Sequence, residues 1–219
     1  MGERIDQKII ERQSRIKEIE NYVQEYFKEH EIGKDSSGYS TQGTILAGSF
    51  WENLNSEHMR PIKEIMDKKL KNKSLVDLGV GSHPNNIPGS WVSWLDSKVP
   101  FKKYTGVDIE KPLGNTEDMV ERMVKKGIDA SYVSDDMLRY ITHLPDKSSN
   151  FFLGAIDSDV ILEEKYWKYL AEEITRAIED KGIIIDAGMS HIGFYLDKNK
   201  FKTIYIDDKM VGRKIFEKV

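Results

Sequence analysis

Leu75-Val-Asp-Leu-Gly-Val-Gly-Ser-His-Pro84 is an apolar run that ends in a Gly-x-Gly pair. The apolar run predicts a buried strand. The glycines predict a sharp turn at which a ligand can lie close to the main chain. Free amides at the start of a following helix favour anionic groups. We therefore expect a strand, a ligand-binding turn and a helix in this order.

The same turn argues against a nicotinamide dinucleotide as the ligand. A pyrophosphate-binding loop follows the pattern Gly-x-Gly-x-x-Gly. Gly79 and Gly81 match the first two positions, but Pro84 occupies the third. An NAD(P)-dependent oxidoreductase is therefore an alternative interpretation and not the first one.

Outward from this turn, short apolar runs alternate with helical segments. The runs predict strands at residues 74–80, 104–109, 130–135, 151–156, 182–187, 201–207 and 212–219. Helices are predicted between them at 87–99, 115–126 and 163–180. Such alternation is typical of a parallel sheet with helices on both faces. The stretch Asp-Lys-Met-Val-Gly is all that separates the last two runs, which predicts an antiparallel hairpin.

The first 72 residues have a different pattern. Residues 5–30 repeat apolar side chains every three or four positions, which predicts an amphipathic helix. A stretch rich in Gly, Ser and Thr at 33–48 predicts a loop, and a second helix is predicted at 57–71. We expect residues 1–72 to form an N-terminal helical cap on a domain formed by residues 73–219. Packing of the first helix on that domain is the first interpretation, and a homodimer is the alternative.

The composition limits the classes of partner. A formal net charge of -4 disfavours nucleic acid, because proteins that bind it present a broad basic surface. The chain has no cysteine, which excludes disulfides, thiolate metal sites and cysteine nucleophiles. The charged N-terminus lacks the apolar core of a secretory signal, and no run reaches the ~18 apolar residues of a membrane span. We expect a cytoplasmic protein without membrane contact.

The segment around the glycines resembles the first motif of class I S-adenosylmethionine-dependent methyltransferases. That motif is a hydrophobic strand followed by Asp-x-Gly-x-Gly, matched here by Asp77-Leu-Gly-Val-Gly81. Many members carry one more glycine at the position of His83. The resemblance implies a three-layer, Rossmann-like α/β fold with a mostly parallel seven-stranded sheet. It also implies that the cofactor is S-adenosylmethionine, contacted by Asp77, Gly79, Val80 and Gly81.

Two further strand ends resemble family motifs. Asp108 ends the second strand, where the resemblance implies an acceptor for both ribose hydroxyls, with Ile109 beside it. Asp136 and Met137 follow the third strand and are implied to contact the adenine, with Asp135 as the alternative to Asp136. Ala155, in the fourth strand, completes the predicted cofactor contacts.

The resemblance extends to the C-terminus and covers residues 73–219. His143-Leu-Pro-Asp-Lys-Ser-Ser-Asn-Phe-Phe152 is similar to the stretch that precedes strand four in the family, with Asn150 in place of the usual Asp. Lys181-Gly182 matches the turn into strand five. The terminal hairpin matches the reversed seventh strand of the family.

Methyl transfer from a sulfonium requires proximity and alignment more than a universal catalytic residue. A base is needed only where the acceptor must lose a proton. The candidate catalytic residues are Asp157, His83 and Tyr39, and each has a structural alternative. These alternatives are a helix N-cap for Asp157, loop shaping for His83 and packing for Tyr39.

Metal assistance is the less favoured variant of this mechanism. Asp157 and Asp186 loosely resemble the carboxylates that hold a divalent cation in catechol-type O-methyltransferases, and oxygen ligands suit magnesium. However, Ala187 and Val160 occupy positions where that group has Asn and Lys. We therefore expect no metal, with Asp157 and Asp186 as the candidate ligands if there is one.

The acceptor is expected to be a small molecule. No Asn-Pro-Pro-Tyr-like motif follows the fourth strand, which argues against amino methylation of DNA bases, and the acidic net charge points the same way. A non-catalytic member of the fold that binds the cofactor or a partner protein is the remaining alternative.

Overall fold

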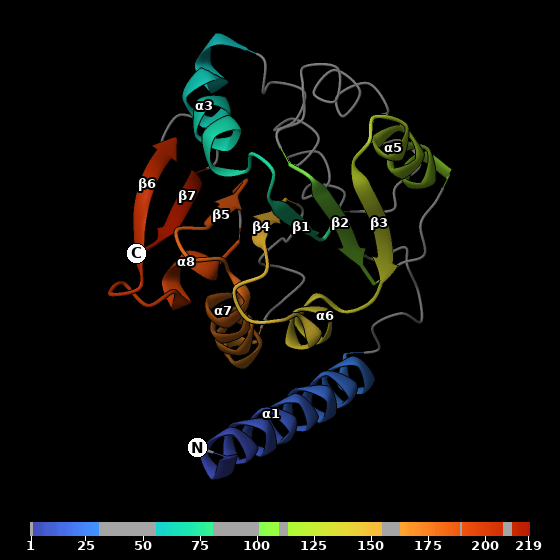
Figure 1. Ribbon diagram of the computed structural model, residues 1–219, viewed down its shortest axis with the longest axis vertical. Helices are drawn as coiled ribbons and strands as arrows, with labels where there is room; N and C mark the ends of the chain where they lie inside the picture. Colours follow the sequence, from blue (N-terminus) through green and yellow to red (C-terminus); the bar gives the residue numbers. More distant parts are fainter. Residues whose placement is uncertain are drawn as a thin grey trace.

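The computed structural model describes residues 2–30, 56–80, 101–109, 114–154, 163–188, 190–207 and 212–219. Its centre is a seven-stranded sheet in the order β3-β2-β1-β4-β5-β7-β6 (Figure 1). The strands are β1 (Ser74–Leu78), β2 (Lys103–Asp108), β3 (Asp129–Ser134), β4 (Asn150–Leu153), β5 (Ile183–Asp186), β6 (Phe201–Asp207) and β7 (Arg213–Lys218). All seven apolar runs of the sequence therefore form the predicted strands.

The strand directions also agree with the prediction. The strands β1 to β5 pair in parallel. Strand β7 pairs antiparallel with both β5 and β6, which makes the terminal hairpin. The order reverses between β1 and β4, because the chain passes from β1 outward to β3 and then returns to β4. Ligands of open α/β sheets bind beyond the carboxyl ends of the strands at such a reversal.

Helices cover both faces of the sheet (Figure 1). The described helices are α1 (Gly2–Glu29), the short 3-10 helix η2 (Glu57–Met59), α3 (Arg60–Lys69), α5 (Gly114–Lys125), α6 (Met137–His143), α7 (Glu164–Ala177) and α8 (Ile192–Tyr195). Apolar side chains of α1, α6, α7 and α8 share one core with the sheet. Those of α3 and α5 share a second core with its other face. This is the predicted three-layer arrangement.

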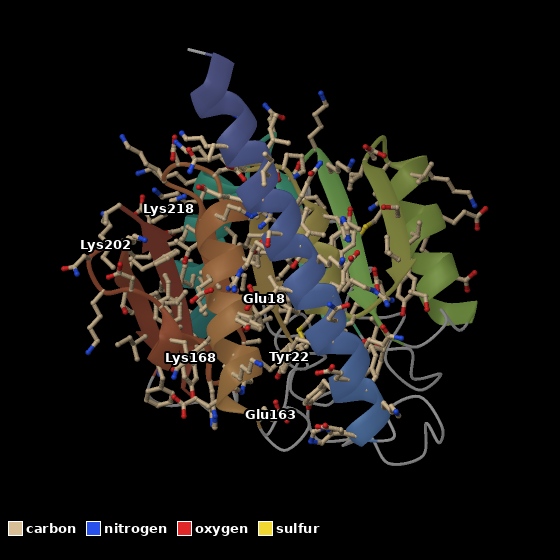
Figure 2. All side chains as sticks on the ribbon, turned by 90° about the horizontal axis from the view of Figure 1, so that it is seen from below. Glu18, Tyr22, Glu163, Lys168, Lys202 and Lys218 are labelled. Carbon is tan, nitrogen blue, oxygen red and sulfur yellow. The ribbon has the colours of Figure 1, made fainter. Side chains whose placement is uncertain are left out.

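Helix α1 packs on the main domain, as the first interpretation of its apolar stripe predicted. Ile19 and Val23 are fully buried, in one cluster with apolar residues of α6 and α7. The guanidinium of Arg12 donates to both carboxylate oxygens of Glu173 on α7, at 2.9 Å each. Figure 2 shows α1 running across α7, with Tyr22 beside Glu163.

Helices α1 and α3, both within residues 1–72, lie on opposite faces of the sheet. Buried residues of α1 belong to the core on the α7 side, and Ile62 and Met66 of α3 belong to the core on the α5 side. Both helices therefore share their apolar contacts with the sheet. The helix predicted at 87–99 lies outside the described residues. Within the described part of the chain, no helix has the length and apolar character needed to cross a membrane.

Candidate active site

The turn after β1 is held against the end of β2. Gly79 has a φ of +71°, in the left-handed region that glycine adopts without strain. The amides of Gly79 and Val80 both donate to the carbonyl of Val107, at 2.9 and 3.3 Å. The predicted sharp turn is thus present and anchored at its first two residues. Gly81, the next residue of the motif, lies outside the described residues.

A second glycine lets this turn approach β2. A Cβ added to Gly106 would lie 3.3 Å from Cγ1 of Val80 and 3.4 Å from the hydroxyl of Tyr104. Contacts this short are tighter than ordinary van der Waals packing, so a larger residue would push against both groups. Gly106 is the register partner of Asp77 on β1. The absent side chain therefore leaves room for the cluster around Asp77.

Asp77 is a buried carboxyl under this turn. Its side chain is 1% exposed, and the Tyr104 hydroxyl donates to Oδ2 at 2.9 Å. The other oxygen, Oδ1, is also buried and accepts from no donor in the described part of the chain. Burial, with the Tyr104 hydrogen bond opposing it and the Asp108 charge adding to it, raises the pKa of Asp77 to about 8. At neutral pH this carboxyl is therefore mostly protonated.

The ends of β2 and β3 meet next to the same turn. Asp108 ends β2 and is partly exposed, and its carbonyl accepts from the amide of Asp135 at 2.8 Å. The hydroxyl of Ser134 donates to the carbonyl of Ile109 at 3.4 Å. The charge of Asp108 acts on the pKa of Asp77, so the two predicted carboxylates share one electrostatic environment. The structure thus brings together the motifs that end the first three strands.

Asp136 has a structural role as the N-cap of α6. Its Oδ1 accepts from the amide of Arg139 at 2.9 Å, and its Oδ2 accepts from the hydroxyl of Tyr166 at 2.6 Å. The residue is 4% exposed, and burial raises its pKa to about 6 against the effect of these two hydrogen bonds. Both carboxylate oxygens are thus already bonded within the protein.

Asp135, the alternative for the adenine contact, is the more accessible carboxylate. Its side chain is 21% exposed, and its Oδ1 accepts from the amide of Asp136 at 2.7 Å and from Nε of Arg139 at 2.5 Å. Met137, predicted to present its backbone amide, is the first residue of α6 and is partly buried. Asp135 is therefore partly exposed and could contact a ligand, whereas the carboxylate of Asp136 is buried.

Asp186 ends β5 beside the end of β4. It is the register partner of Leu153 and is 3% exposed. Burial raises the pKa of Asp186 to about 6, although the amide of Gly188 donates to Oδ1 at 3.1 Å and lowers it. A buried carboxyl with a raised pKa at a strand end is a candidate functional group.

Several predicted residues lie outside the described part of the chain. They are Tyr39, Gly81, His83, Ala155 and Asp157. The sequence analysis also missed two members of the site, Tyr104 and Tyr166, which are fully buried and hydrogen-bonded to Asp77 and Asp136. Their positions in an apolar strand and an amphipathic helix predict that both side chains are buried. Nothing in the sequence indicates that either hydroxyl is bonded to a carboxyl group.

Comparison with solved structures finds methyltransferases. A proposed methyltransferase from Escherichia coli, yhhF, has a TM-score of 0.50 and 9% sequence identity and covers 73% of this chain and 84% of its own. A proposed methyltransferase from Streptococcus mutans in complex with SAH has a TM-score of 0.48 and 15% sequence identity, and the match covers 74% of this chain and 97% of its own. An rRNA methylase from Streptococcus thermophilus has a TM-score of 0.48 and 15% sequence identity, and the match covers 74% of this chain and 96% of its own.

No protein-family model matches the sequence. No curated protein matches it either. Identities this low establish a shared fold and leave the activity open. The fold predicted from the sequence, a Rossmann-like sheet with a reversed last strand, is confirmed by the strand order and by the E. coli structure.

Proposed function

We propose that this protein is a methyltransferase that uses S-adenosylmethionine. The observation that carries the proposal is the turn at Gly79, which is pinned to β2 with Asp77 beneath it and Asp108 beside it. The turn lies at the carboxyl ends of the strands next to the reversal of strand order, where this class of sheet binds ligands. The cofactor would supply a methyl group that is already activated by its sulfonium.

The described residues fit an adenosyl ligand with several donor groups. Asp108 is accessible and offers two oxygens to vicinal ribose hydroxyls. Asp77 lies buried beneath the turn and is held by the Tyr104 hydroxyl, so in this proposal it supports the loop and does not charge the site at neutral pH. Gly79, Gly81 and Val80 form the proposed loop contacts, with Ile109 and Ala155 flanking the adenosyl group.

For the adenine, the contacts favour Asp135 over Asp136 as the side-chain acceptor. Asp136 is buried and occupied by Arg139 and Tyr166, whereas Asp135 is partly exposed at the same strand end. In this proposal Asp136 fixes the start of α6, and the amide of Met137 faces the ring. Tyr166 then acts as a positioning residue, because it holds Asp136 from α7.

The acceptor is proposed to be a small molecule, on the basis of the acidic net charge. Asp157, His83 and Tyr39 remain the proposed catalytic candidates, and Asp186 joins them because it is a buried carboxyl with a raised pKa at the end of β5. Where the acceptor must lose a proton, a base with a pKa near neutrality is the efficient choice. Asp157 and Asp186 are also the proposed ligands if a divalent cation assists.

The proposal is tested by the formation of S-adenosylhomocysteine from S-adenosylmethionine in the presence of a panel of phenols, amines, thiols and RNA. We expect turnover with at least one small-molecule class and a loss of at least about tenfold in Asp108→Ala, since a hydrogen bond to a charged group contributes about 1.5–3 kcal/mol. Asp129→Ala is the control that should keep full activity, because Asp129 lies at the amino end of β3, far along the strands from Asp108. Turnover with RNA alone would overturn the proposed acceptor class.

A further inference from the structure

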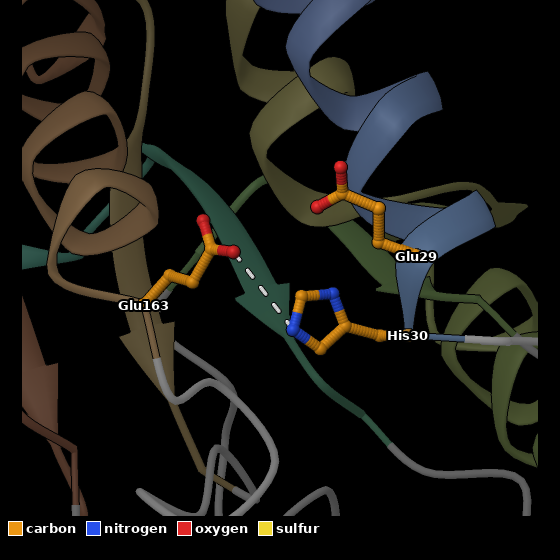
Figure 3. Close-up of side chains that lie close together, drawn as sticks. All are labelled: Glu29, His30 and Glu163. Atoms are coloured by element: carbon orange, nitrogen blue, oxygen red, sulfur yellow. Dashed lines mark ion pairs between the residues drawn. The ribbon is translucent and has the colours of Figure 1, made fainter.

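Three potential metal ligands converge where α1 ends and α7 begins. They are Glu29, His30 and Glu163, and one ligand atom of each lies within 4.8 Å of the others (Figure 3). Nε2 of His30 is 3.8 Å from Oε1 of Glu163. The residues come from segments more than 130 positions apart in the sequence, so the packing of α1 on α7 creates this group.

The imidazole of His30 is oriented by a contact outside the group. Nδ1 lies 3.0 Å from the carbonyl of Tyr26, and a carbonyl only accepts, so Nδ1 carries the proton. The Tyr26 ring lies beside the imidazole, with 4.3 Å between the ring centroids. In the neutral ring this leaves the lone pair on Nε2, the atom that faces Glu163. Histidine ligands of metals are commonly held in this way, with the other nitrogen donating to a backbone carbonyl.

The carboxylate of Glu163 is oriented by α1 as well. The hydroxyl of Tyr22 donates to its Oε2 at 2.7 Å, which leaves Oε1 directed at His30. The nearby ammonium of Lys165 lies over the Tyr22 ring, 4.6 Å from its centroid. The two carboxylates and the carboxyl end of the α1 dipole favour a cation at this point, against the amino end of the α7 dipole and the Lys165 ammonium. The two full carboxylate charges are the larger contribution.

We propose that Glu29, His30 and Glu163 bind a divalent transition metal of the Zn²⁺ class. Magnesium and calcium prefer sites built from oxygen alone, whereas one imidazole nitrogen with two carboxylates suits Zn²⁺ and Co²⁺. Ligand atoms about 2.0–2.2 Å from zinc lie closer to one another than these do, so the side chains must move inward. Glu29 and His30 are exposed and have room for that movement. The site would fasten the end of α1 to the start of α7.

The test uses the full chain without a histidine tag and needs no methyl donor. Zn²⁺ binding is measured by calorimetry, and Co²⁺ is added separately so that its visible d–d absorption reports nitrogen and oxygen ligands. The variants are His30→Gln, Glu163→Gln and Glu29→Gln. The control is His143→Gln, which removes another histidine–glutamate pair, that of His143 Nε2 and Glu20 Oε1 at 3.1 Å.

We expect one Zn²⁺ per chain and at least about tenfold weaker binding in each of the three variants, because even outer-shell partners of a metal contribute 10–100-fold to affinity. His143→Gln should bind like the unmodified chain. Circular dichroism identifies a variant that fails to fold, and exposed Glu29 then provides the deciding measurement. If the unmodified chain binds no Zn²⁺, or if His30→Gln and Glu29→Gln bind as well as it does, the group is only an ion pair and the proposal is wrong.

Discussion

The substitution Asp77→Asn replaces a fully buried carboxyl by a neutral amide of the same shape. The amide oxygen can still accept from the Tyr104 hydroxyl, which lies 2.9 Å from Oδ2 in the native protein. The substitution therefore removes the possibility of a buried charge while keeping the packing. Its effect on the free energy of unfolding isolates the cost of ionising Asp77.

The direction of the pH dependence follows from the raised pKa of Asp77. Its value in the folded protein is about 8, against an ordinary value of 3.8. Between these two values the folded state holds a proton that the unfolded state has lost, so the stability contribution is complete below pH 3.8 and declines as pH rises to about 8. One proton corresponds to a slope of about 1.4 kcal/mol per pH unit, or about 3 kcal/mol between pH 5 and pH 7.

The assay is urea denaturation of both proteins at four pH values from 5 to 8. We expect Asp77→Asn to gain stability relative to the unmodified protein as pH rises, with the slope given above between pH 5 and pH 7 and a shallower slope as pH approaches 8. Other buried carboxyls titrate in both proteins and cancel in the difference. Asp129→Asn, whose side chain is 70% exposed, is the control and should give a flat difference. A flat difference for Asp77→Asn, or one of the opposite sign, would refute the reasoning.

Three further substitutions test the contacts around the sheet. Arg12→Ala removes the two hydrogen bonds from α1 to buried Glu173, which keeps its contact with Arg176. Urea denaturation should show a loss at the lower end of about 1.5–3 kcal/mol, whereas an unchanged midpoint would mean that α1 is held by its apolar face alone. Tyr166→Phe leaves Asp136 without a donor to Oδ2 and should weaken S-adenosylhomocysteine binding in a titration, while equal affinity would argue against a positioning role. Asn150→Asp puts a carboxylate where an amide nitrogen donates to β1. We expect the free energy of unfolding at pH 7 to fall by more than about 2 kcal/mol, measured by thermal denaturation. An unchanged thermal midpoint would contradict this role of Asn150.

The strands of the sheet could be predicted because each one shows its burial in its own short stretch of sequence. Strands buried on both faces are apolar without interruption, as the Ile183–Asp186 strand is, and the turns between them carry glycine or polar residues. The resemblance to methyltransferases added the mostly parallel sheet with a reversed last strand, and the order of the strands was not predicted. Short helices were missed for a related reason: α6 and α8 have too few turns to show a repeating apolar pattern.

The candidate site was predicted in part. Asp77 and Asp108 both lie near the carboxyl ends of their strands, and they come close together because β1 pairs in parallel with β2. The different roles of Asp135 and Asp136 could not be predicted, because they depend on Tyr166, a residue 30 positions away that approaches from α7.

Asn150 shows the same limit in the core of the sheet. Neither the apolar pattern nor the motif explains an asparagine at the position where the family has aspartate. In the structure its amide nitrogen donates to the carbonyl of Ser74, at 3.1 Å, and its oxygen accepts from the amide of Ile183, at 2.8 Å. An ionised aspartate could accept but not donate here, whereas the amide does both, and the two bonds join β4 to the strands on either side.

The measurement that tests the central proposal most directly is a calorimetric titration of the protein with S-adenosylmethionine, S-adenosylhomocysteine and NAD, with Asp108→Ala beside it. The proposal predicts that both adenosyl ligands bind, that NAD does not, and that the variant loses about 1.5–3 kcal/mol of binding free energy. Binding of NAD in place of the adenosyl ligands would contradict the proposal and favour an NAD(P)-dependent oxidoreductase. Binding of none of the three would contradict the account and leave the turn at Gly79 with a structural role alone.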